Sequence, residues 1–113
     1  MNAKGLVDRA LLLLGYSENY DILSVSALNA VNRVYADLFF IDNTEGFKEI
    51  TELTQPVQLS ERLLFDVAPY GVAAHLALSV GESDSQAYLA SIYNQKRKKL
   101  TGSGTLQDVL PTV

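Results

Sequence analysis

Apolar residues recur at helical spacing in the first stretch of the chain and are followed by a glycine. The positions i, i+4, i+7 and i+8 of one helical face are all apolar: Leu6, Ala10, Leu13 and Leu14. This pattern predicts a helix over residues 3–14. Gly15 marks its end, because a glycine just past the last apolar residue can take the left-handed conformation that closes a helix. We interpret residues 16–23 as a loop.

The second apolar pattern is the clearest and predicts a helix over residues 25–42, with Ser24 or Ser26 as its N-cap. One broad arc of this helix is apolar: Ala27, Leu28, Val31, Val34, Tyr35, Leu38, Phe39 and Ile41. We expect this arc to face the core. Arg33 and Asp37 are predicted to face away from it.

Phe40 breaks the pattern of the second helix. It projects on the polar side, between the directions of Asn29 and Arg33. Two interpretations stay open: the loop after the helix covers Phe40, or Phe40 anchors a partner, because aromatic residues often dominate interface energies. Phe40 and Arg33 are therefore candidate interface residues.

We predict irregular structure over residues 43–60, because Gly46 and Pro56 interrupt the segment. Extended chain is indicated by apolar and β-branched residues: Thr51, Leu53, Val57 and Leu59. Near 47–59 the chain is either irregular or a short β-hairpin. The segment is longer than most connections in compact domains, which favours a role in function or in pairing with another chain.

A third helix is predicted to begin with Asp66 as its N-cap, which would put Pro69 in the first turn, where a missing N–H does no harm. From 70 to 80 nearly every side is apolar, and Gly81 ends the helix. Small residues allow close contact with other helices: Gly71, Ala73, Ala74 and Ala77. We expect this to be the central, most buried helix.

A fourth helix is predicted to open with a Ser-x-x-Gln capping box, Ser83 to Gln86, and to end at Gly102. Its core stripe has four members: Leu89, Ile92, Tyr93 and Leu100. Residues 103–113 have too little periodic apolar character for a helix, so we interpret them as an extended, flexible C-terminal tail. The expected fold is all-α: four main helices packed as a small bundle.

Length and composition support one domain. The 113 residues are 48% hydrophobic and 19% charged, which is ordinary globular usage. We expect a helical domain over residues 1–102, followed by the tail. No stretch approaches the roughly 20 consecutive apolar residues of a transmembrane helix, so no membrane association is expected. The chain has no cysteine, which excludes disulfides and thiolate chemistry.

The net charge of −4 predicts no general attraction to nucleic acid. One local run argues otherwise: Lys96, Arg97, Lys98 and Lys99. Adjacent cations can contact phosphates. The favoured interpretation is that they complement the negative end of the fourth helix, which leaves a weak nucleic-acid contact as the alternative.

The sequence offers little for catalysis. His75 is the only histidine, and no carboxylate or nucleophile lies three or four residues from it, which predicts a structural role. The acidic segment 42–46 lacks the ligand spacing of a calcium loop. No phosphate-binding glycine loop or nucleophile elbow occurs. We therefore expect no enzyme activity, cofactor, metal site or small-molecule substrate.

Four segments resemble the small helical head-to-tail connector proteins, also called neck or adaptor proteins, of tailed bacteriophages and prophages. The first is residues 3–16, ending Leu-Gly-Tyr, and the second is 29–38, Asn-Ala-Val-Asn-Arg-Val-Tyr-Ala-Asp-Leu. The third is 68–74, Ala-Pro-Tyr-Gly-Val-Ala-Ala. The fourth is Gly81 together with 93–97, Tyr-Asn-Gln-Lys-Arg. Together they span most of the chain.

This resemblance implies a structural virion subunit of four or five helices that joins a ring of identical copies between the portal and the tail. The implied partners are the chain itself, portal and tail proteins, and the DNA that passes through the ring. The implied location is the virion, and the host cytoplasm during assembly. We expect three tail residues to contact neighbours: Leu106, Val109 and Leu110. The alternative is a non-viral helical adaptor that presents the Phe40 face to one protein partner.

Overall fold

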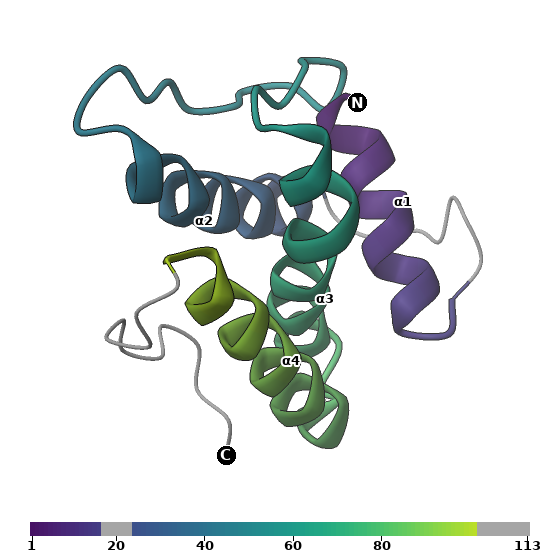
Figure 1. Cartoon of the computed structure of the whole chain (residues 1–113). Helices are drawn as coiled ribbons and strands as arrows, with labels where there is room; N and C mark the ends of the chain where they lie inside the picture. Colours follow the sequence, from purple (N-terminus) through teal and green to yellow (C-terminus); the bar gives the residue numbers. More distant parts are fainter. Residues whose placement is uncertain (17–23, 102–113) are drawn as a thin grey trace.

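Four α-helices and one π-helical turn make up the regular structure of residues 1–16 and 24–101, the part of the chain that the computed structural model describes (Figure 1). The elements are α1 (Ala3–Leu13), α2 (Ser24–Asp42), η1 (Leu63–Val67), α3 (Ala68–Ser79) and α4 (Ser83–Thr101). The predicted all-α fold is confirmed. The expectations for Gly102, for the tail, and for Leu106, Val109 and Leu110 lie outside the described residues.

Both ends of α1 follow from local chemistry. At its start, the side chain of Asn2 accepts a hydrogen bond from the Gly5 amide, which satisfies one of the free N–H groups of the first turn. At its end, Gly15 has a φ of 87°, and the Tyr16 amide donates to the Leu11 carbonyl. This pattern is a Schellman motif, so the predicted stop at Gly15 is confirmed.

The third helical segment begins earlier than predicted. Its backbone is already helical at Glu61, so the prediction of Asp66 as N-cap is wrong. In η1 the Ala68 amide donates to the Leu63 carbonyl, five residues back. Pro69 lacks an N–H and would collide with the preceding turn of a regular α-helix. The wider π turn lets the helix continue through the proline.

α3 contacts each of the other three α-helices and runs down the middle of the view in Figure 1. Its buried residues lie on all sides: Ala68, Pro69, Gly71, Val72, Ala73, Ala74, Leu76 and Ala77. At Gly71 the side chains of α2 and α4 come close to α3, because a Cβ there would be 2.8 Å from the Tyr93 ring and 2.8 Å from Val34. Only a glycine leaves room for this contact.

The segment from 43 to 60 is irregular, and no strand occurs within 47–59, so the hairpin alternative is not realised. Its backbone pairs instead with the N-terminus: the Ala3 amide donates to the Gln55 carbonyl, and the Val57 amide donates to the Met1 carbonyl. The segment therefore runs from the end of α2 across to the start of α1 (Figure 1). Its hydrogen-bond partner is thus remote in sequence.

α4 begins at Ser83, and the Gln86 amide donates to the Glu82 carbonyl. Glu82 is therefore the N-cap, one residue before the predicted cap, Ser83, which lies instead in the first turn of the helix. The preceding α3 ends at Ser79, and Gly81, the predicted stop, follows its C-cap with a φ of 77°. Along the expected core stripe, Leu89 and Tyr93 are buried, and the other two members are half-buried.

Candidate functional site

A polar joint connects α2 to α4 through Asp37. Its carboxylate accepts hydrogen bonds from the Tyr93 hydroxyl at 2.6 Å and from the Arg97 Nε at 2.7 Å. The Arg97 Nη2 donates to the second carboxylate oxygen at 2.9 Å, so the pair is bidentate. The expectation that Asp37 faces away from the core is therefore wrong, because α4 covers that side of α2.

In this joint Tyr93 and Arg97 are buried, and Asp37 is half-buried. Burial raises the pKa of Tyr93 well above its ordinary value, and the neighbouring Asp37 carboxylate raises it further. The phenol therefore stays protonated and acts as a hydrogen-bond donor. Among the described residues, no buried side-chain nitrogen or oxygen lacks a partner. The joint is complete within this chain, which indicates a structural role.

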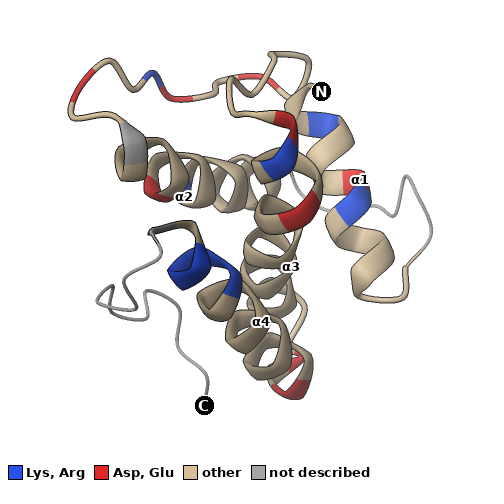
Figure 2. Ribbon diagram, in the orientation of Figure 1, with Lys and Arg blue, Asp and Glu red and all other residues tan. Residues whose placement is uncertain are grey.

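The basic run of α4 is divided among different surroundings. Lys96 pairs with Asp66 at 2.8 Å and lies 5.2 Å from the centre of the Tyr70 ring, whereas Arg97 is buried in the joint with Asp37. Lys98 is half-buried and Lys99 is exposed. The basic residues cluster at the C-terminal end of α4 (Figure 2). The weak nucleic-acid contact that remained the alternative for residues 96–99 stays untested.

Phe40 belongs to an aromatic cluster at the C-terminal end of α2. Its ring lies 5.6 Å from that of Phe39 and 5.8 Å from that of Phe47, which comes from the following loop. It remains 49% exposed. The loop therefore covers Phe40 only in part. The role of Phe40 as an anchor for a partner stays a prediction. A hollow of about 300 Å³ adjoins the cluster between α2 and the loop, and Tyr35 and Phe39 line it.

A second polar site is a pocket of about 250 Å³ between α2 and α3. Its lining residues come from both helices: Ser26, Asn29, Ala30, Arg33, His75, Leu78 and Ser79. Burial lowers the pKa of His75, and the positive charge of Arg33 lowers it further. His75 therefore remains largely neutral at pH 7. The sequence pointed to Arg33 as a candidate interface residue and to His75 as a structural residue. It did not predict the pocket, because only the packing of α2 on α3 brings the two together.

Neither a metal centre nor a membrane span is found in residues 1–16 and 24–101. No group of three or more His, Cys, Asp or Glu side chains is arranged to hold a metal ion there. In the same residues, no helix combines the length and the hydropathy that crossing a membrane requires. In comparisons with protein-family models, curated proteins and solved structures, this chain matches none.

Proposed function

We propose that this chain is a structural subunit of a head–tail connector ring, between the portal and the tail of a tailed bacteriophage. One observation carries the proposal: three of the four segments that resemble connector proteins meet around Tyr93, at the Asp37 joint and the neighbouring Gly71 contact. Asp37 comes from the second segment, Gly71 from the third, and Tyr93 and Arg97 from the fourth. The resemblance therefore concerns residues that act together in three dimensions.

A ring closes only if each subunit presents its two contact faces at a fixed angle. The joint favours such rigidity, because a bidentate ion pair and a close helix crossing at Gly71 hold α2 against α3 and α4. A flexible angle would instead give open chains or mixed ring sizes. The joint thus supports a subunit suited to closed assembly.

Two exposed apolar side chains lie at opposite ends of α2. Val25 is 70% exposed near its start, and Phe40 is 49% exposed near its end. They are separated along the helix by about 22 Å, at 1.5 Å per residue. Two different faces on one subunit are what a head-to-tail ring contact requires. We propose that the Val25 face of one copy meets the Phe40 face of the next.

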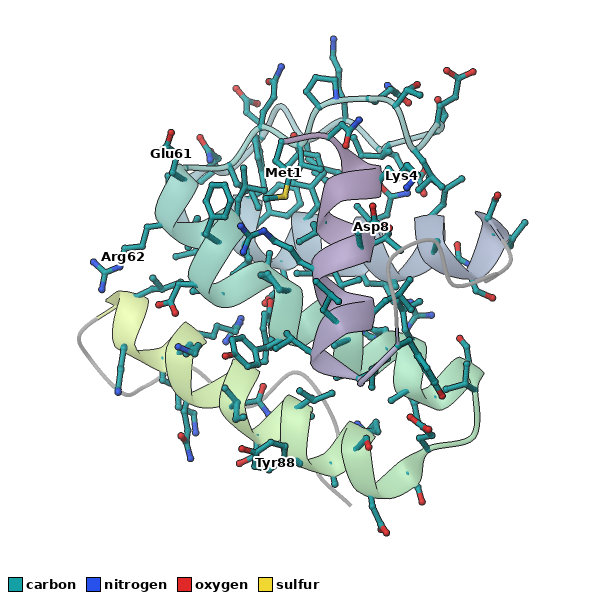
Figure 3. All side chains as sticks on the ribbon, turned by 90° about the vertical axis from the view of Figure 1, so that its right-hand side faces the viewer. Met1, Lys4, Asp8, Glu61, Arg62 and Tyr88 are labelled. Carbon is teal, nitrogen blue, oxygen red and sulfur yellow. The ribbon has the colours of Figure 1, made fainter. Side chains whose placement is uncertain are left out.

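Sedimentation and negative-stain imaging of the full chain at high concentration test the ring. We expect closed particles for the unaltered chain, and monomers with an unchanged melting temperature for Val25→Glu and for Phe40→Glu. Tyr88→Glu is the control, because Tyr88 is 68% exposed and lies on α4 (Figure 3), whereas both proposed faces lie on α2. It should assemble normally.

Mixing the two monomeric variants sharpens the test. Each keeps one intact face, so a 1:1 mixture should form dimers that cannot grow into rings. Rings that persist in both single variants would contradict the proposed contact. A full chain that stays monomeric at every concentration, alone and with portal protein, would contradict the ring.

The second candidate, a non-viral helical adaptor, is favoured by the open aromatic cluster at Phe40. Half-exposed aromatic rings often anchor a protein partner. An adaptor would remain monomeric and lose its partner in Phe40→Glu but not in Val25→Glu. A ring subunit would lose assembly in both variants, which separates the two functions.

A further inference from the structure

The pocket between α2 and α3 presents hydrogen-bond donors without a carboxylate. Asn29 and Arg33 are one turn apart on α2, and His75 and Ser79 are one turn apart on α3, so each pair lines the same side of its helix. The lining residues include no acid. The absence of an acid from the pocket wall contrasts with the net charge of −4 of the whole chain.

The cation in this pocket is not neutralised by the described part of the chain. Arg33 is exposed, and within residues 1–16 and 24–101 it forms no ion pair. Its guanidinium is close enough to His75 for its charge to act on the imidazole. A planar guanidinium matches the oxygens of a tetrahedral oxyanion, and it binds them with paired hydrogen bonds.

We propose that this pocket binds a phosphate-type oxyanion, either free inorganic phosphate or a phosphate group of a nucleic-acid backbone. Arg33 supplies the charge and two donors. His75 supplies an imidazole N–H, and Asn29 and the two serines complete the set of donors around the anion. A pocket of about 250 Å³ has room for such a group together with water.

Protonation of His75 is coupled to this binding. Arg33 is the charged group that acts on His75, and neither α2 nor α3 contributes an acid to the pocket wall. A bound dianion would offset the charge of Arg33 and favour the imidazolium. The pKa of His75 should therefore rise when the pocket is filled.

Proton NMR measures this directly, because His75 is the only histidine of the chain. The untagged full-length protein is titrated with acid in sulfate and in chloride at equal ionic strength, since sulfate keeps its charge over the range in which histidine titrates. We expect sulfate to raise the pKa of His75 by about one unit, the shift typical of a nearby opposite charge. Inorganic phosphate should produce the same rise.

Two arginine variants locate the effect. Arg33→Gln should raise the pKa of His75 in chloride, because a neighbouring positive charge is gone, and should abolish the further rise in sulfate. Arg62→Gln is the matched control, because Arg62 is an exposed arginine that precedes η1 and lies outside the pocket (Figure 3). Its response to sulfate should equal that of the unaltered chain.

A short DNA duplex distinguishes the two sources of phosphate. Duplex binding that weakens in Arg33→Gln but not in Arg62→Gln identifies a nucleic-acid backbone, whereas a sulfate and phosphate response without duplex binding identifies the free anion. A pKa of His75 that is the same in chloride, sulfate and phosphate would overturn the proposal. So would an equal loss in both arginine variants. The readout works on a monomer and is independent of ring assembly.

Discussion

Two arginines near α2 differ in burial and in their charged partners. Arg97 reaches α2 from α4, is buried, and shares the Asp37 carboxylate with Tyr93. Arg33 lies on α2 itself, one turn before Asp37, is exposed, and faces a pocket without an acid. The same side chain thus has a complete set of partners in one place and an incomplete set in the other.

The difference follows from the cost of burial. A charge removed from water must be paired within the fold, because an uncompensated buried ion costs several kcal/mol. An exposed charge keeps its hydration and can exchange water for a ligand. We therefore infer that the Asp37 joint stabilises the fold, whereas the Arg33 pocket is available for binding. Each prediction below tests one side of this comparison.

The largest effect is expected for Asp37→Ala. The variant leaves Arg97 buried without its carboxylate and leaves the Tyr93 hydroxyl without its acceptor. Breaking a buried ion pair on one side typically costs about 3–5 kcal/mol. Urea denaturation should show a loss of that size.

Asp66→Ala is the matched control for this variant. Asp66 also pairs with a cation of α4, Lys96, but its side chain is 53% exposed. Exposed pairs contribute about 0–1 kcal/mol. Equal losses in the two aspartate variants would contradict the view that burial distinguishes the joint from ordinary surface pairs.

The next largest effect is expected for Gly71→Ala. A Cβ at 2.8 Å from both Tyr93 and Val34 would push α3 away from its neighbours. Overpacking of this kind costs about 1–3 kcal/mol. Gly5→Ala is the control, because there the nearest atom is the flexible side chain of Met1, at 3.0 Å. Removing a glycine within α1 should be neutral or stabilise by up to about 1 kcal/mol.

The helices and the caps set by glycine could be predicted from the sequence because their causes are local. α1 begins at the predicted residue, α2 begins one residue early, and Gly15 and Gly81 have positive φ. Apolar spacing and glycine placement act within a few residues. These features therefore need no knowledge of the tertiary contacts.

The errors and omissions have non-local causes. Asp37 lies on the polar arc of α2, yet the packing of α4 covers it and supplies Arg97. Asp66 is a residue type that favours the N-cap position. The helix nevertheless begins at Glu61 and accommodates Pro69 through a π turn. The phosphate pocket was not predicted because it exists only between two packed helices.

A moderate effect is expected for Asn32→Ala, which tests an uncharged contact on the same helix. The Asn32 amide donates to the Ile50 carbonyl at 2.8 Å and accepts from the Ile50 amide at 2.7 Å. Losing both bonds should cost about 1–2 kcal/mol, less than loss of the Asp37 carboxylate. Asn43→Ala, which removes one exposed bond, should change the denaturation midpoint less. A loss in Asn32→Ala that matches Asp37→Ala would remove the distinction between charged and neutral joints.

The smallest effect is expected for Arg33→Gln, which should change the free energy of unfolding at neutral pH by less than about 0.5 kcal/mol, because an exposed side chain without an ion pair contributes little. Its effect should appear in the pH dependence instead. The pKa of His75 is lowered in the folded chain, first by burial and then by Arg33, so between that value and the ordinary 6.5 the unfolded chain binds more protons. The contribution of His75 to stability is therefore complete above pH 6.5 and is lost as the pH falls toward the folded pKa.

Arg33→Gln removes one of the two causes, so its folded pKa of His75 lies closer to 6.5 and the loss on acidification is smaller. Urea midpoints at about pH 7.5 and about pH 5.5 measure this difference, with the carboxylates common to both proteins cancelling in the comparison. His75→Gln serves as the reference, because it removes the whole histidine contribution. An Arg33→Gln midpoint that falls as steeply as that of the unaltered chain would mean that Arg33 does not act on His75. Arg33 would then be an ordinary surface charge, and only its greater exposure would distinguish it from Arg97 in the Asp37 joint.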